Sequence, residues 1–230
     1  MPRADLVLPS LLLAALLGAS GPTAPTAGPV AGERAPVADE RGTIEGTVLL
    51  DLPAARRSTS RYPGSGLVTA RQHDVPPVVW LSGDLPPAPA MAEQPIRQTD
   101  GRFVPGALAV TVNSQVGFPN DDSFYHNVFS YSGPRFDLGR FPAGQSRRVR
   151  LTEPGIVEVF CEVHEFMRAT ILVTEHDFHA VAGEDGSFRI DRVPAGTYRL
   201  HAWHPDVGET STDVTVTDGR PTSVTLEWGP

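Results

Sequence analysis

The amino-acid sequence predicts an all-β protein, and three observations support this. The chain contains 22 glycines and 23 prolines among 230 residues, and only 20% of its residues are charged. Short runs rich in Val, Ile, Thr and Phe are bounded by Gly, Pro, Asn or Asp. Many short strands joined by turns account for this pattern better than long helices do. The length suffices for one large β domain or two small ones.

The first residues resemble a secretory signal peptide. Arg3 precedes an apolar stretch at 6–17, which small residues follow at a plausible cleavage site, so we expect residues 1–20 to be removed. This stretch is shorter than the roughly 20 residues that cross a bilayer. We therefore expect an exported protein, periplasmic or extracellular, with no integral membrane segment in its mature form. Residues 21–42 are rich in Gly, Pro and Ala and predict a flexible linker.

The strand signals fall into three groups. Residues 43–93 contain two expected strands, at 43–50 and 78–81, separated by a long irregular loop, Pro53–Pro77. Residues 94–175 contain signals whose spacing suggests a Greek-key sandwich, at 102–104, 108–112, 115–118, 127–131, 145–151, 155–161 and 169–174. Residues 176–230 contain signals for a second, smaller β-sandwich, at 186–190, 193–200, 210–216 and 222–228.

The charge of the chain argues against a nucleic-acid partner. The formal net charge is −8, whereas nucleic-acid binding depends on a clustered basic surface that neutralises phosphates. The one basic cluster consists of Arg147, Arg148 and Arg150. We interpret it as a solvated strand and turn rather than as a docking patch for an acidic partner.

Cys161 is the single cysteine, so an intramolecular disulfide is impossible. A lone thiol in an oxidising compartment is a liability unless it is buried, paired between chains or bound to a metal. The apolar alternation before Cys161 places it at the end of a strand, and His164 and Met167 follow in a short loop. A thiolate, an imidazole and a weak thioether suit a copper–thiolate centre with two equatorial histidines and an axial methionine. Zinc would be better served by a fourth strong ligand.

The second imidazole must come from elsewhere in the chain. Seven histidines are present, and His126 is the best placed, at the head of an expected strand with apolar neighbours. An alternative is that positions 161, 164 and 167 form one stripe of a helix. Val and Ile crowding, together with Gly155, argues against a helix there. The pattern favours a copper site over this alternative.

With these motifs in view, residues 94–175 resemble the cupredoxin (plastocyanin/azurin) family, and the loop from Cys161 to Arg168 is similar to the short ligand loop of amicyanin. The resemblance implies a mononuclear type 1 copper ion with His126, Cys161, His164 and Met167 as ligands. It also implies that Asn127 ties the two ligand loops together and forms a hydrogen bond near the thiolate. Many relatives have proline directly after the second histidine, where this chain has Glu165, so the choice of partner and the reduction potential do not carry over.

Residues 180–229 resemble the carboxypeptidase regulatory-like (transthyretin-like) domain, on the segments 183–190 and 193–198. That family usually begins with strands like those expected in residues 43–93. The resemblance implies an immunoglobulin/transthyretin-like sandwich into which the cupredoxin unit is inserted, with a structural or adaptor role. No Ser-His-Asp arrangement that would make this module an enzyme is evident in the sequence.

The remaining histidines and the tryptophans have simpler interpretations. The pair His176 and His179 and the pair His201 and His204 could each form a further metal site, but solvated turn positions are favoured because neither pair has evident partner ligands. His73 is interpreted in the same way. The three tryptophans are expected to fill sandwich cores or edges, at positions 80, 203 and 228.

The sequence thus predicts a non-enzymatic copper protein that transfers single electrons between redox partner proteins. Four protein ligands leave no open coordination position for a substrate. Two alternatives remain: a protein that stores, delivers or senses copper, and an adhesion or assembly module without metal.

Overall fold

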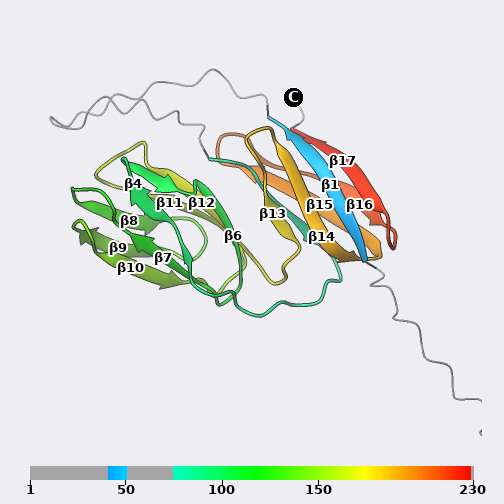
Figure 1. The fold of residues 1–230 in the computed structure, drawn as a ribbon, viewed down its shortest axis with the longest axis horizontal. Helices are drawn as coiled ribbons and strands as arrows, with labels where there is room; N and C mark the ends of the chain where they lie inside the picture. Colours follow the sequence, from blue (N-terminus) through cyan, green and yellow to red (C-terminus); the bar gives the residue numbers. More distant parts are fainter. Residues whose placement is uncertain (1–40, 51–74, 229–230) are drawn as a thin grey trace, which may run out of the picture. The chain divides into compact units, whose positions relative to one another are not determined.

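The computed structural model describes residues 41–50 and 75–228, and regular structure in these ranges consists of strands alone (Figure 1). No helix in these ranges could cross a membrane. The expected signal peptide, most of the expected linker, His73 and most of the Pro53–Pro77 loop lie outside the described residues. The strands are β1 (Arg41–Leu49), β2 (Val78–Ser82), β3 (Gln94–Pro95), β4 (Arg97–Thr99), β5 (Arg102–Val104), β6 (Ala107–Thr111), β7 (Gln115–Pro119), β8 (His126–Ser130), β9 (Phe136–Phe141), β10 (Ser146–Arg150), β11 (Gly155–Phe160), β12 (Arg168–Thr174), β13 (His179–Val181), β14 (Ser187–Pro194), β15 (Gly196–His204), β16 (Gly208–Val216) and β17 (Pro221–Glu227).

Strands β3 to β12 form one sandwich, called here the central sandwich. Its larger sheet has the order β6-β12-β11-β8-β9, its smaller sheet has the order β10-β7-β3, and β4 pairs with β5. The two sheets enclose one apolar core, to which the inward-facing residues of both sheets contribute. Phe118 of β7, Val159 of β11 and Ile171 of β12 are fully buried in this core.

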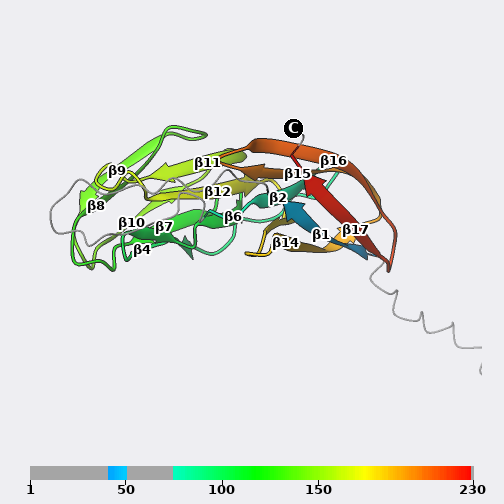
Figure 2. The ribbon, with the colours of Figure 1, turned by 90° about the horizontal axis from the view of Figure 1, so that it is seen from above.

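Strands β1, β2 and β13 to β17 form a second sandwich, called here the flanking sandwich. One sheet has the order β14-β1-β17 and the other has the order β13-β2-β15-β16; Figure 2 shows them as two layers. Both sheets contribute to a shared core that includes Ile44, Leu81, Leu200 and Leu226. Strands from distant parts of the chain therefore build this sandwich, since β1 pairs with β14 and β17 while β2 pairs with β15.

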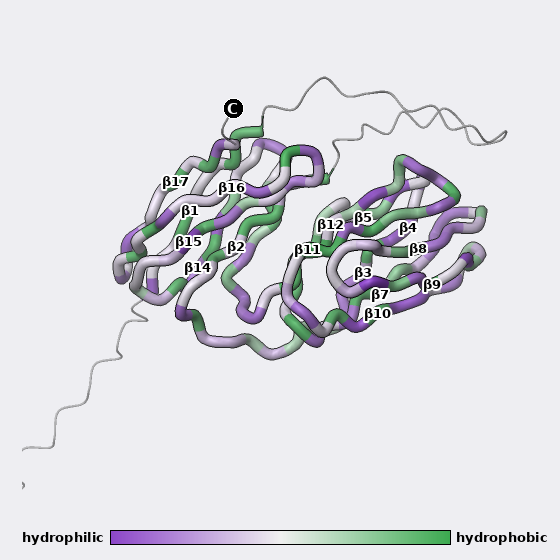
Figure 3. The backbone as a smooth tube through the Cα atoms, turned by 180° about the vertical axis from the view of Figure 1, so that it is seen from behind, coloured by the Kyte–Doolittle hydropathy of each residue, from purple (hydrophilic) through white to green (hydrophobic). Residues whose placement is uncertain are grey.

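Hydrophobic and hydrophilic residues follow one another closely along the strands (Figure 3). In β15 the buried residues are Tyr198, Leu200, Ala202 and His204, every second position of the strand. Trp80 and Trp203 pack against a small apolar cluster that includes Val78 and Leu172, and Trp228 packs against the core of the flanking sandwich. These positions agree with the expectation that the tryptophans fill cores or edges.

Several strands differ from the sequence-based expectations. Strand β9 was not expected from the sequence. Its burial does not alternate along the strand, and Gly139 lies within it at φ 67°. Strands β3, β4 and β13 were not expected either, and they have only two or three residues. The expected break between 190 and 193 was wrong: β14 continues to Pro194, and the chain turns at Ala195. The antiparallel pairing of β14 with β1 continues on both sides of the expected break and reaches Pro194, with a register shift between Gly42 and Ile44 opposite the break.

Candidate metal centre

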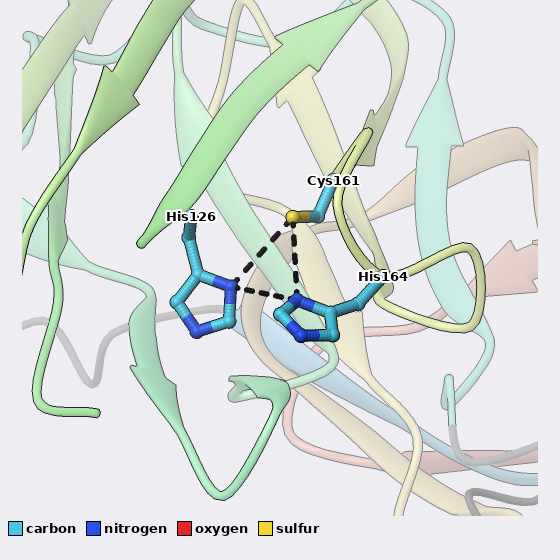
Figure 4. A group of neighbouring side chains, drawn as sticks. All are labelled: His126, Cys161 and His164. Atoms are coloured by element: carbon cyan, nitrogen blue, oxygen red, sulfur yellow. Dashed lines mark hydrogen bonds between the residues drawn. The ribbon is translucent and has the colours of Figure 1, made fainter. Parts of the chain in front are cut away.

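Three side chains from two segments of the central sandwich point toward one another (Figure 4). His126 is the first residue of β8, Cys161 directly follows β11, and His164 lies in the loop between β11 and β12. Strand β11 pairs with β8 in antiparallel orientation, so the end of β11 and the start of β8 lie at the same end of the sheet. Among the described residues, His126, Cys161 and His164 are the one group of His, Cys, Asp or Glu that could hold a metal ion, with ligand atoms within 4.8 Å of one another.

The three donor atoms form a small triangle. Cys161 Sγ lies 3.6 Å from His126 Nδ1 and 3.9 Å from His164 Nδ1, and the two Nδ1 atoms are 3.1 Å apart. All three side chains are buried, with exposed fractions of 3%, 0% and 7% for Cys161, His126 and His164. A thiol and two imidazole nitrogens thus face one common point that is shielded from water.

Met167 lies in the same loop and is 1% exposed, within the apolar core that also contains Cys161. The loop is closed by two backbone hydrogen bonds: Met167 N–H donates to His164 O at 2.9 Å, and Cys161 N–H donates to Met167 O at 3.3 Å. This segment forms bends and turns, so the helical alternative for positions 161, 164 and 167 was wrong. These bonds link the backbone of Cys161, His164 and Met167 within one short loop.

Asn127 connects the two segments that carry the donors. Its Oδ1 accepts a hydrogen bond of 2.6 Å from the backbone N–H of Glu162, the residue after Cys161. Backbone N–H groups of Asn127, Val163 and His164 also hydrogen-bond to the Cys161 thiol and lower its pKa. Burial outweighs them, so the pKa of Cys161 is raised overall.

Burial also sets the protonation of the two imidazoles. It lowers the pKa of His126, against opposing contributions from the Asp122 carboxyl group, and it lowers the pKa of His164 together with repulsion from His126. A neutral imidazole has one nitrogen with a free lone pair, which is the form that binds metals. In the absence of metal, the site therefore favours two neutral imidazoles and a protonated thiol.

Two residues of the site were missed from the sequence. Asp122 Oδ2 lies 2.8 Å from His126 Nε2, and Phe124 packs its ring against both imidazoles, with centroid distances of 4.9 Å to His126 and 5.2 Å to His164. Both residues lie in the non-repetitive segment between β7 and β8, where no periodicity indicates which side chains turn inward. Their closeness to His126 in sequence was the one available signal.

The charged residues of the ligand loop are on the surface. Glu162 and Glu165 are exposed, and Glu162 forms an ion pair with Arg140 at 3.3 Å. Phe124 and Tyr125 are also exposed, by 41% and 58%. The surface near the site thus combines aromatic side chains with carboxylates.

Among the described residues, the other histidine pairs do not belong to any group of three or more His, Cys, Asp or Glu donors that could hold a metal ion. His179 Nδ1 lies 3.0 Å from Thr174 Oγ1, and His176 Nδ1 accepts a hydrogen bond from Phe178 N–H. His176 and His179 are only partly exposed rather than fully solvated, and His204 is buried. For His179, His201 and His204, the expectation of solvated turn positions was wrong, because all three lie in strands of the flanking sandwich.

The flanking sandwich brings together a hydroxyl, an imidazole and a carboxylate that the sequence did not indicate. His201 Nε2 lies 2.8 Å from Ser82 Oγ, and His201 Nδ1 lies 2.7 Å from Glu209 Oε1. The three residues come from β2, β15 and β16, and the Trp80 ring stacks on His201. Because the Glu209 side chain is 49% exposed, and acyl transfer also requires oxyanion donors in a water-excluded site, we assign this as a cross-strand hydrogen-bond network.

Comparison with known proteins gives partial similarities. A family model described as polysaccharide lyase family 4, domain II, matches residues 152–224, less than half of the chain. No curated protein matches the sequence. Among solved structures, the Cu-containing nitrite reductase (NirK) of Thermus scotoductus SA-01 is 26% identical, with 40% of this chain and 23% of that chain covered and a TM-score of 0.34.

Two structures of amicyanin variants are also similar to part of the chain. One, in the oxidized state, is 23% identical, with 34% of this chain and 79% of the amicyanin chain covered and a TM-score of 0.33. The other, in the reduced state, is 22% identical, with 41% of this chain and 97% of the amicyanin chain covered and a TM-score of 0.34. The chain spans less than a quarter of the nitrite reductase. At these TM-scores the likenesses carry no argument about function.

Proposed function

We propose that this chain is an exported cupredoxin that binds one type 1 copper ion through His126, Cys161, His164 and Met167 and transfers single electrons between redox partner proteins. The observation that carries the proposal is the buried triangle formed by Cys161 Sγ and the two histidine Nδ1 atoms. Copper, when bound, supplies one-electron redox chemistry.

The donor triangle has the dimensions that a metal at its centre requires. With about 2.0 Å to each imidazole nitrogen and about 2.3 Å to a thiolate, a trigonal arrangement would separate the nitrogens by about 3.5 Å and each nitrogen from the sulfur by about 3.7 Å. The corresponding separations here are 3.1 Å, 3.6 Å and 3.9 Å. The donor chemistry, one thiol and two imidazoles beside a buried thioether residue, favours copper over zinc.

The protein's own residues are suited to hold such a centre rigid. Asn127 fixes the backbone after Cys161, the two loop hydrogen bonds fix His164 and Met167, and the Phe124 ring covers both imidazoles. Strands and a closed loop resist rearrangement, and a small rearrangement between oxidation states is what fast outer-sphere electron transfer needs. Phe124 and the nearby His164 edge provide the route for the electron to the surface.

The decisive experiment is the visible spectrum and voltammogram of the full chain reconstituted with Cu(II). We expect an intense thiolate-to-copper band and a reversible one-electron wave, and we expect Cys161→Ser to abolish the band. His179→Asn is the matched control, because it removes an imidazole outside the triangle and should leave the band unchanged. A colourless copper-loaded wild-type protein would contradict the proposal.

Copper storage, delivery or sensing is the rival function, and it predicts a different result. Delivery requires copper to leave the site, whereas the three donors here are almost completely buried. A Cu(I) chelator of comparable affinity should therefore remove copper within minutes from a delivery protein but much more slowly from the electron carrier proposed here.

We also propose that the cupredoxin unit, residues 94–175, is inserted into a carboxypeptidase regulatory-like sandwich completed by residues 43–93 and 176–230. The pairing of β1 with β14 and β17, and of β2 with β13 and β15, supports this arrangement. Expression of residues 94–175 alone tests it, since an inserted unit with its own core should fold and bind copper.

Mass determination of the exported chain tests the proposed cleavage of the signal peptide after residue 20.

A further inference from the structure

Asp122 is a buried carboxyl group that the proposed ligand set leaves without a role. It lies four residues before His126, its side chain is 8% exposed, and its Oδ2 lies 2.8 Å from His126 Nε2. We propose that Asp122 is a positioning residue that holds His126 as the Nε2-protonated tautomer and thereby turns the Nδ1 lone pair toward Cys161 and His164. The metal part of this inference rests on the proposed function.

The carboxyl group of Asp122 is fixed from the opposite side by the turn between β4 and β5. Its Oδ1 accepts a hydrogen bond of 2.7 Å from Asp100 N–H, and its Oδ2 accepts one of 3.0 Å from Gly101 N–H. Both turn residues have positive φ, 53° and 68°, a conformation that aims their consecutive N–H groups at one acceptor. Asp122 is therefore oriented before any metal binds.

The backbone of Asp122 is also held in place. Asp122 N–H donates to Asn120 Oδ1 at 3.1 Å, and Asn120 Nδ2 in turn donates to the carbonyl oxygens of Phe124 and Phe141. The segment that carries Asp122 is thus anchored at both ends of the short connection between β7 and β8. A side chain anchored in this way can determine the orientation of a neighbour.

The tautomer of His126 follows from the hydrogen-bonding capacity of the two groups. Both Asp122 oxygens already accept backbone N–H groups, so the carboxyl acts as an acceptor, and the imidazole nitrogen facing it must carry the proton. In a neutral imidazole the other nitrogen then has a free lone pair. That nitrogen is Nδ1, which lies 3.6 Å from Cys161 Sγ. Carboxylate–histidine pairs fix metal-ligating imidazoles by this means.

The first test needs no metal. Long-range ¹⁵N–¹H spectra of the metal-free full chain distinguish Nε2–H from Nδ1–H imidazole, and we expect Nε2–H for His126. Asp122→Asn keeps the side-chain size but replaces one acceptor with a donor, so we expect the Nδ1–H form to become populated. Asp121→Asn is the matched control, because Asp121 is adjacent, carries the same charge and bonds to Arg97 instead. A wild-type Nδ1–H tautomer, or a tautomer unchanged in a folded Asp122→Asn, would overturn the inference.

The second test uses copper. Loss of the carboxylate would remove negative charge near the metal and would weaken the binding of Cu(II) more than the binding of Cu(I). We expect the ratio of Cu(II) to Cu(I) affinity to fall about tenfold in Asp122→Asn, which corresponds to a rise of about 59 mV in potential. Asp121→Asn should give a much smaller rise, and equal shifts in the two variants would count against Asp122. If the wild-type chain binds no copper, the proposed function fails, while the metal-free tautomer still decides the role of Asp122.

Discussion

His126 Nδ1 and Cys161 Sγ lie 3.6 Å apart, although 35 residues separate them in the chain. The antiparallel pairing of β8 with β11, through Phe129 and Phe160, brings the two residues to the same end of the sheet. Asn127 then joins the segments through its bond to Glu162. The pairing of the strands therefore determines the geometry of the site. The substitutions below change the pKa values, the copper affinity or the stability in different ways.

Phe124→Ala should expose His164. Burial is the largest cause of the lowered pKa of His164, and the Phe124 ring, 5.2 Å away, provides part of that burial. We expect the pKa of His164 in the metal-free protein to rise toward its ordinary value near 6.5. An NMR titration of the His164 ring protons measures this, with Tyr131→Ala, a remote and 72% exposed aromatic, as control. A pKa of His164 that falls in Phe124→Ala would show that the ring does not shield the imidazole.

Acid should destabilise the metal-free protein from about pH 6.5 downward. Burial lowers the pKa values of His126, His164, His176 and His179 below 6.5, so the unfolded chain binds more protons than the native protein once the pH falls below that value. The contribution of these histidines to the free energy of unfolding is therefore fully present above about pH 6.5. It is lost as the pH falls through their lower native pKa values. Urea denaturation at about pH 5 and about pH 7.5 measures the difference. Greater stability at the acidic pH would contradict the prediction.

Copper binding should release a proton from Cys161. Burial raises the pKa of this thiol, so at neutral pH the metal-free site holds a protonated sulfur that must ionise to bind copper. We expect the apparent copper affinity to rise with pH throughout the range below that raised pKa. Calorimetric titrations in buffers of different ionisation enthalpy count the released protons. Binding without proton release would show that the thiolate is already formed.

Met167→Leu should retain copper but raise the reduction potential. The substitution conserves the volume of a residue that is 1% exposed, so the free energy of unfolding should change by less than about 1.5 kcal/mol. Loss of the weak thioether donor would remove electron donation to Cu(II), and the reduction potential of such sites responds to this donor. Voltammetry of the copper-loaded variant measures the shift, with Met91→Leu, a surface methionine, as control. An unchanged potential would remove Met167 from the ligand set.

Leu200→Ala should destabilise the protein without changing the metal site. Leu200 is fully buried in the core of the flanking sandwich, which shares no residue with the core around Cys161. The cavity should lower the free energy of unfolding of the domain that contains it by about 2–5 kcal/mol. Denaturant unfolding measures the loss, and the visible spectrum of the copper-loaded folded variant should match that of the wild type. A shifted thiolate band would reveal coupling between the two cores.

The sequence by itself determined the all-β character of the chain and the local order of Cys161, His164 and Met167. Turn residues between short apolar runs act on neighbouring residues alone, and a loop of seven residues keeps its side chains close whatever the rest of the fold does. For the same reason, β9 escaped prediction: its pairing with β8 defines it as a strand, and the burial of its own residues does not alternate.

The tertiary structure alone decided how far-apart residues meet. It placed His126 Nδ1 against Cys161, aimed Asp122 at the far side of the same ring, and formed the Ser82–His201–Glu209 network from three strands. These contacts depend on strand register and on backbone hydrogen bonds from distant turns, such as the Asp100 N–H that holds Asp122. Because one residue of register moves a side chain to the opposite face of a sheet, such contacts are set only when the whole sandwich is assembled.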